Sequence, residues 1–316
     1  MRHPDDFAPL PGQPEEIAPG IRRILCDNPS AFTFRGTNTY LVGKGSGIAV
    51  IDPGPLDVHH QAAIEAALAP GERITHIFVT HAHADHAPLA RYLARSTGAP
   101  VLAHGDAETG RSEVMRRLAA QGGLGGGEGV DADFAPDRRL AHDEIVEGDG
   151  WRIRALWTPG HQCNHMSFDL AFEGESFGTV FCGDHVMAWS TSIVSPPDGD
   201  LTQFMESCAL LRERPARVYY PGHGPELTAP HDRLDWLVAH RRTREEGILR
   251  ALAEGPADAQ LIARRVYTDI AAHLLPAAER NVLAHLIDLA SKKLVIPEGD
   301  LAADAVFRPV GGQTGK

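Results

Sequence analysis

Four predicted strands in this 316-residue chain are each followed by a histidine or an aspartate. The clearest case is ITHIFVT (74–80), an apolar, β-branched segment that runs directly into HAHADH (81–86). Strands of a mostly parallel α/β sheet present their carboxyl ends along one edge, so we expect the polar residues that follow them to converge. These residues are His81, His83, Asp85 and His86 in the motif, His161 after Ile153–Trp157, Asp184 after Thr179–Cys182, and His223 after Val218–Tyr220.

The residue types in this set indicate a metal centre. Neutral imidazole and carboxylate are ligands that suit Zn²⁺, and the same ligands also accept Mn or Fe. In an extended chain His81 and His83 point to the same side. HAHADH alone could be a histidine-rich surface loop, and a lone histidine after Pro-Gly, such as His161 or His223, is more typical of a turn. The HAHADH motif by itself already favours a metal site over a surface loop, because chance rarely produces this spacing, and the other three positions strengthen the interpretation.

The remaining pattern predicts a layered α/β domain followed by a helical module. Short buried strands alternate with helical segments at 59–69, 87–96 and 201–214. Residues 1–20 contain five prolines and are expected to form a loosely ordered, extended arm. The glycine-rich segment 121–130 has no phosphate-binding frame such as GxGxxG and is interpreted as a mobile loop near the site. We divide the chain into the arm (1–20), a catalytic domain (21–230) and a C-terminal domain (231–316).

The C-terminal domain resembles a winged-helix module. Helical segments at 233–255, 259–267 and 276–293 precede two short strands, LVIP (294–297) and DAVFRPV (304–310). Three helices and a hairpin in under 80 residues are typical of that architecture.

Charge and cysteine content limit the expected partners and location. There are 42 Asp+Glu against 30 Lys+Arg, and this net charge of −12 argues against a whole-protein field that gathers nucleic acid. No apolar run approaches the ~20 residues of a membrane helix, and the first residues lack the apolar stretch of a signal peptide. We therefore expect a cytoplasmic protein that does not bind membranes. Four cysteines without a CxxC pair are expected to be reduced thiols.

The motifs resemble those of the metallo-β-lactamase superfamily. The match consists of HxHxDH at 81–86, TPGH ending at His161, GD ending at Asp184, and PGHG around His223. This resemblance implies a four-layer αβ/βα sandwich that binds two Zn²⁺ ions, with Mn or Fe as alternatives. By position, His81, His83 and His161 would hold the first metal, Asp85, His86 and His223 the second, and Asp184 would bridge them.

A closer resemblance, to the lactamase-beta-2-like branch, covers nearly the whole chain. It consists of GTNTYLVG (36–43), TPGHQCNHM (158–166), SIVSPPDGD (192–200) and PGHGP (221–225), together with the C-terminal winged helix. Some members of this branch are single-strand endoribonucleases. The flavo-diiron branch fits less well because it has a glutamate where this chain has His83, whereas mononuclear iron thiol dioxygenases share part of the frame.

The resemblance implies hydrolysis by water that two metal ions activate. Two Zn²⁺ ions that share a water lower its pKa to near ~7, so that a bridging hydroxide is the nucleophile. Asp85 and Asp184 are then catalytic residues as well as ligands, and Asp85 accepts the nucleophile's hydrogen bond. His165, four residues after His161, or else His185, is the candidate acid that protonates the leaving group. The candidates for substrate contact are Asn38, His185 and Trp189.

Two substrate classes suit such a centre. The first is a single-stranded RNA phosphodiester, for which the winged helix offers phosphate contacts at Arg264, Arg265, Arg280, Lys292 and Lys293. The second is a small carbonyl compound, such as a thioester, lactone or β-lactam, which an acidic surface does not oppose. A third interpretation, a DNA-reading regulator, is weakened because the third helix of the module lacks a dense basic face. Formation of a homodimer through the module stays open.

Overall fold

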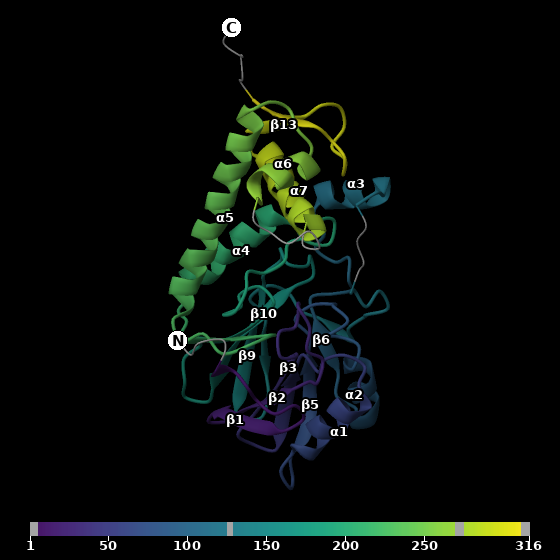
Figure 1. Cartoon of the computed structure of the whole chain (residues 1–316). Helices are drawn as coiled ribbons and strands as arrows, with labels where there is room; N and C mark the ends of the chain where they lie inside the picture. The colour runs from purple at the N-terminus through teal and green to yellow at the C-terminus, as the bar shows by residue number, and fades with distance from the viewer. Residues whose placement is uncertain (1–5, 125–128, 269–274, 311–316) are drawn as a thin grey trace.

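Two β-sheets packed face to face form the centre of the catalytic domain (Figure 1). The computed structural model describes residues 6–124, 129–268 and 275–310. Within these residues the first sheet has seven strands in chain order: β1 (Pro14–Ala18), β2 (Ile21–Leu25), β3 (Asn38–Val42), β4 (Gly47–Ile51), β5 (Arg73–Phe78), β6 (Val101–Ala103) and β7 (Arg138–Arg139). The second, with five described strands, contains β8 (Ile145–Glu147), β9 (Trp151–Trp157), β10 (Met166–Phe172), β11 (Thr179–Gly183) and β12 (Val218–Pro221).

The strand directions bring several carboxyl ends to one end of the domain. In the first sheet β4 to β7 run parallel, whereas β1 to β4 pair antiparallel. In the second sheet β11 and β12 are parallel, and β9 runs the same way because β10 is antiparallel to both of its neighbours. The expectation of one mostly parallel sheet is therefore wrong. The strands that lead to the candidate ligands belong to two mixed sheets. Some of these strands run in the same direction without being neighbours in a sheet.

Helices cover both outer faces of this pair of sheets. The first sheet packs on α1 (Val58–Ala66) and α2 (Ala90–Thr97), and the second packs on α4 (Leu201–Glu213) and α5 (Pro230–Ala253). Between the sheets lies a core in which each fully buried side chain, such as Phe168, contributes about 2 kcal/mol to folding. The layers are helix, sheet, sheet and helix, which confirms the predicted four-layer αβ/βα sandwich.

Local sequence explains where three of these helices begin. Asp57 and Asp200 each accept hydrogen bonds from two backbone N–H groups in the first turns of α1 and α4. Helix α5 begins at Pro230 rather than at residue 233 as predicted. Proline is tolerated there because backbone N–H groups in the first turn have no partner within the helix, so the N–H that proline lacks is not missed.

The C-terminal module consists of α5, α6 (Ala259–Val266), α7 (Leu275–Ser291) and a hairpin of β13 (Val295–Pro297) and β14 (Phe307–Pro309) (Figure 1). These elements share one apolar cluster. The arrangement of three helices followed by an antiparallel hairpin agrees with the prediction. No helix in the described ranges is both long and apolar enough to cross a membrane. The four cysteines are free and buried.

Two parts of the chain differ from the sequence prediction. The expected arm over residues 1–20 is wrong for Pro14–Ala18, which form β1 and pair with β2; Pro14 is tolerated because it takes the first position of an edge strand. Helix α3 (Glu113–Gln121) is an additional element that packs Met115 into the cluster of the C-terminal module.

The glycine-rich segment 121–130 is described only in part. Its residues 125–128, on which the prediction of a mobile loop falls, lie outside the described residues. Past them, Gly129 O accepts a hydrogen bond from Ala84 N at 2.6 Å, so the end of this segment lies against the HAHADH motif.

A buried carboxyl group in β10 makes the stability of the fold depend on pH. Burial raises the pKa of Asp169 from 3.8 to about 6, although Oδ1 accepts the Gly178 N–H at 2.7 Å. Because the folded-state pKa lies above the unfolded value, the fold favours the protonated carboxyl group. The free energy of unfolding is therefore highest below about pH 4, and this contribution is lost as pH rises through about 6. We expect Asp169→Asn to increase the free energy of unfolding at pH 8 by on the order of 2 kcal/mol.

Urea unfolding at pH 4.5 and pH 8 measures this effect. The exposed Glu173→Gln, close by in the chain, is the control and should change neither value. A loss of stability in Asp169→Asn that is equal at both pH values would contradict the prediction.

Candidate metal centre

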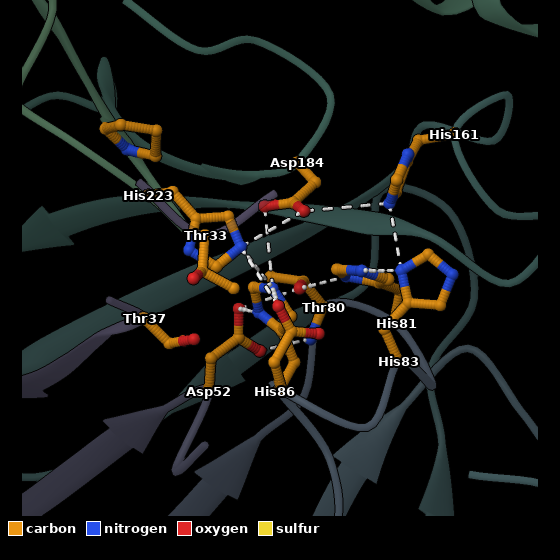
Figure 2. Close-up of polar contacts among 12 residues, drawn as sticks. Thr33, Thr37, Asp52, Thr80, His81, His83, His86, His161, Asp184 and His223 are labelled. Atoms are coloured by element: carbon orange, nitrogen blue, oxygen red, sulfur yellow. Dashed lines mark hydrogen bonds and ion pairs between the residues drawn. The ribbon is translucent and has the colours of Figure 1, made fainter. Parts of the chain in front are cut away.

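The structure brings all seven predicted ligand residues together at the carboxyl ends of the strands. Strand β5 leads into the HAHADH motif, and β9, β11 and β12 lead to His161, Asp184 and His223, whose side chains point toward one another in Figure 2. The candidate ligand atoms form two groups, within each of which all atoms lie within 4.8 Å of one another. The first group is His81, His83, His161 and Asp184, and the second is Asp85, His86 and His223.

Three imidazole nitrogens converge in the first group. Nδ1 of His83 lies 2.9 Å from Nε2 of His81 and 3.0 Å from Nε2 of His161. Asp184 completes the group, with Oδ2 at 3.7 Å from His161 Nε2. Three nitrogens and one oxygen around a point match the ligand number of a tetrahedral zinc site.

Two imidazoles and two carboxylates meet in the second group. Nε2 of His86 lies 3.2 Å from Nε2 of His223, and Asp85 Oδ2 lies 3.2 Å from the latter atom. Asp184 also reaches this group, because its Oδ1 lies 3.5 Å from His86 Nε2 and its Oδ2 lies 3.3 Å from His223 Nε2. Asp184 therefore contacts both groups, as a bridging ligand must.

Outer hydrogen bonds determine which nitrogen of His161 and His223 faces the centre. His161 Nδ1 donates to Ile193 O at 2.7 Å, and His223 Nδ1 donates to Gly36 O at 3.2 Å. A carbonyl oxygen only accepts, so in both rings Nδ1 carries a proton and Nε2 is the nitrogen that faces the centre.

Asp52 likewise determines which ring nitrogen of His81 and His86 faces the centre. Its Oδ2 accepts from His86 Nδ1 at 2.9 Å and from Thr80 Oγ1 at 2.7 Å. Because the Thr80 hydroxyl proton points at Asp52, the hydroxyl oxygen accepts from His81 Nδ1 at 2.9 Å. One buried carboxylate thus orients an imidazole of each group. The sequence analysis does not predict Asp52; its signal is an acid directly after a buried strand, in IDPG (51–54).

The two groups also differ in how they hold protons. Burial and the neighbouring imidazole of His161 lower the pKa of His83 to about 3. In the second group burial lowers the pKa of His223, but the nearby carboxylates, Asp184 above all, raise it more. The pKa of His223 therefore rises to about 9. The second group therefore attracts positive charge, and the first presents neutral imidazoles.

These residues fit divalent cations. Bare imidazole lone pairs and carboxylate oxygens face one another inside the protein, where they repel unless a proton or a cation lies between them. Within the described residues, the buried Oδ1 of Asp184 has no hydrogen-bond partner, so it is available as a ligand atom. Nitrogen and carboxylate oxygen in this combination suit Zn²⁺, Mn²⁺ or Fe²⁺.

His165 and His185, the predicted acid candidates, lie next to the candidate ligands and are completely buried. His165 Nδ1 contacts Thr158 Oγ1 at 3.0 Å, and its Nε2 accepts the backbone N–H of Asp184 at 3.2 Å, so both ring nitrogens have partners. The His185 ring packs on Phe204 with centroids 4.4 Å apart. These contacts favour a positioning role for His165 and a packing role for His185 over proton transfer to a leaving group.

Asn38 and Trp189 differ in their access to substrate. Asn38 is completely buried, and its Nδ2 donates to two backbone carbonyls of the 221–224 loop at 3.1 and 2.9 Å, so it holds the loop that contains His223. Trp189 is partly exposed and stacks on Phe34 with ring centroids 5.0 Å apart. Trp189 therefore stays a prediction for substrate contact, whereas the contacts of Asn38 favour a positioning role.

Comparison with known protein families gives two matches. Residues 32–223 match the model of the metallo-beta-lactamase superfamily, and residues 259–304 match the beta-lactamase associated winged helix domain. The first match contains all seven candidate ligands. The second contains α6, α7 and β13 within its bounds and confirms the winged-helix prediction.

Two relatives and two solved structures resemble the chain over most of its length. It is 30% identical over 285 residues to the beta-lactamase-like protein 2 homolog of Drosophila melanogaster, which covers 86% of this chain and 88% of that protein. It is 31% identical over 250 residues to the atrochrysone carboxyl ACP thioesterase of Passalora fulva, over 78% of this chain and 66% of that protein.

The solved structures show the same fold. A beta-lactamase domain protein from Burkholderia ambifaria has a TM-score of 0.77 at 23% identity and covers 96% of both chains. A metallo-beta-lactamase family protein from Thermus thermophilus has a TM-score of 0.72 at 25% identity, over 93% of this chain and 100% of that one.

Proposed function

We propose, since this chain belongs to the metallo-β-lactamase superfamily of metal-dependent hydrolases, that it hydrolyses thioesters with apolar acyl groups. Water adds to the carbonyl carbon and the C–S bond breaks, which yields a carboxylate, a thiol and one proton. The observation that carries this proposal is a set of apolar side chains beside the metal centre, here called the apolar rim. The rim consists of Phe32, Phe34, Trp189 and Ile193.

The apolar rim lies on the two backbone segments that orient ligand imidazoles. Gly36 O and Ile193 O are the carbonyls that accept from these imidazoles. Phe32 and Phe34 lie just before Gly36, and Trp189 lies just before Ile193. Phe32 is 66% exposed and Ile193 is 47% exposed, so both are accessible to a substrate. Exposed apolar side chains beside a polar centre favour a substrate with an apolar part.

The residues of the chain divide the work of hydrolysis. A divalent cation bound here supplies a Lewis acid that activates water and polarises the carbonyl group. Asp85 is 27% exposed against 9% for Asp184, so it is the more open carboxylate and accepts the proton that water loses. The outer hydrogen bonds of His161 and His223 hold the site in one geometry, which avoids reorganisation during the reaction.

RNA cleavage is the second candidate function. The guanidinium of Arg35 lies 5.4 Å from the ring centroid of Phe34 and places a cation at the apolar rim, where a phosphate could bind. Against RNA, two of the basic residues predicted as phosphate contacts, Arg265 and Lys292, are paired with acidic side chains. The name of the Passalora fulva relative, a thioesterase, supports the acyl substrate.

Steady-state hydrolysis of a series of pantetheine thioesters tests this proposal. We expect a kcat/KM above about 10⁴ M⁻¹s⁻¹ for the octanoyl thioester. The acetyl thioester should react at least ~10-fold more slowly, because each buried CH₂ group contributes about 0.8 kcal/mol. Ile193→Ser should lower the octanoyl-to-acetyl ratio, whereas Arg35→Met should not. Cleavage of a labelled single-stranded RNA that is faster than hydrolysis of every thioester would instead support the second candidate.

A further inference from the structure

Two arginines of α5 hold the backbone of a loop, residues 187–193, beside the metal centre. Arg233 donates to two carbonyls of this loop, from Nε at 2.8 Å and from Nη2 at 2.7 Å. Arg241 donates from Nη2 to Ser192 O at 2.5 Å. These contacts join the first helix of the C-terminal module to a loop of the catalytic domain.

Arg241 is unusual because its guanidinium is almost completely buried. The residue is 2% exposed, and its Cζ lies 5.1 Å from the ring centroid of Phe204. In the part of the chain that the structure describes, no carboxylate pairs with Arg241 and its Nε has no hydrogen-bond partner. A buried cation without a counter-ion costs several kcal/mol, so packing alone would favour an apolar side chain here. The hydrogen bond to the loop is the evident reason for a guanidinium at this position.

The loop that Arg241 holds leads directly to a metal ligand. Ser192 is followed by Ile193, whose carbonyl accepts from His161 Nδ1 at 2.7 Å. The Ser192 hydroxyl also donates to the carbonyl of His185, the residue after Asp184, at 2.6 Å. A displacement of Ser192 would therefore move the hydrogen-bond partner of one ligand and the backbone next to another.

Arg233 holds the first half of the same loop. Its two acceptors, Met187 O and Ser190 O, lie on either side of Trp189 in the chain. Trp189 stacks on Phe34 and packs on the loop after His223, since a Cβ added to Gly224 would lie 2.7 Å from its Cδ1. Arg233 thus sets the position of one side of the apolar rim.

We propose that Arg233 and Arg241, here called the arginine clamp, are positioning residues of the metal centre. They hold loop 187–193 so that Ile193 O keeps His161 in its ligand orientation and Trp189 stays in the apolar rim. Helix α5, which leads into the winged helix, then takes part in hydrolysis. The effect on the metal rests on the proposed function, whereas the ordering of the loop needs neither metal nor substrate.

Hydrogen–deuterium exchange of the full-length protein, with and without a chelator, tests the ordering of the loop. Arg241→Met keeps an apolar stem and removes the hydrogen bond, and we expect amides in 185–195 to exchange at least ~10-fold faster. Arg242→Met is the matched control, because Arg242 is the exposed neighbour on the same helix. Unchanged exchange in Arg241→Met would overturn the proposal.

Titration with Co²⁺ tests the link to the metal ligand. We expect Arg241→Met to bind Co²⁺ about 10- to 100-fold more weakly and to shift its visible absorption bands, because the partner of His161 moves. Arg241→Lys should restore part of the affinity, and Arg242→Met should match the wild type. Val282→Ala, a cavity in the core of the module, should lower Tm without changing Co²⁺ affinity.

An equal loss of Co²⁺ affinity in Val282→Ala and Arg241→Met would show general destabilisation of the module and would overturn the clamp. A wild-type protein that binds no Co²⁺ would instead contradict the proposed function and the link to His161. In that case the exchange experiment would still decide whether the clamp orders the loop.

Discussion

Asp184→Ala is expected to lower kcat/KM for the octanoyl thioester by at least about 10⁴-fold and to reduce bound metal by at least ~1 equivalent. The reason is that the Asp184 carboxylate contacts His161 in the first group and both His86 and His223 in the second. Its removal leaves neither group with a complete ligand set. Elemental analysis after metal loading and gel filtration, together with initial rates, measures both effects.

The matched control for this experiment is Asp304→Ala, which removes an exposed carboxylate from the C-terminal module. We expect wild-type rates and wild-type metal content from the control. Wild-type rates in purified, folded Asp184→Ala would refute the assignment of this carboxylate to the reaction.

Asp52→Asn should weaken the binding of metal by about 10- to 100-fold and lower activity in proportion. The carboxylate accepts three hydrogen bonds, from His86 Nδ1, Thr80 Oγ1 and Thr80 N. An amide has a single acceptor oxygen, so in either orientation its NH₂ group would face a donor and the hydrogen bonds that orient His86 would be weakened. His86 Nε2 would then be held less firmly in its position facing the centre.

Competition with a coloured zinc chelator measures this loss, and saturating metal should restore most of the activity. If saturating metal restores activity, Asp52 acts by orienting His86 and His81. Added metal would not restore the activity lost with a residue that reacts with substrate. Metal affinity equal to that of the wild type would contradict the role of Asp52.

The candidate ligands could be predicted from sequence because they follow short buried strands. ITHIFVT runs directly into His81, and the strand before Asp184 ends at Gly183. The parallel pairing of β11 and β12 brings Asp184 and His223 side by side. The resemblance to a known family added the division of the candidate ligands between two metal ions, whereas the pattern of three helices and a hairpin already predicted the winged helix. Local pattern and family motif together therefore predict the metal centre and the four layers.

Contacts between distant parts of the chain could not be predicted in this way. β1 forms because the edge of β2 accepts it, although Pro14 and the nearby prolines suggest an arm. Asp52 follows a buried strand, but only the fold places it against Thr80 and His86, 28 and 34 residues away. Likewise, nothing in the sequence of α5 indicates that Arg241 reaches the carbonyl of Ser192.

Anomalous diffraction from zinc-loaded crystals tests the central claim most directly, namely that side chains from four strand ends bind a pair of cations. Two peaks are predicted on either side of Asp184, one about 2.0–2.1 Å from nitrogens of His81, His83 and His161, the other at the same distance from His86 and His223. A map from fully loaded crystals with no peak between these imidazoles, or with zinc only at other surface sites, would contradict the claim.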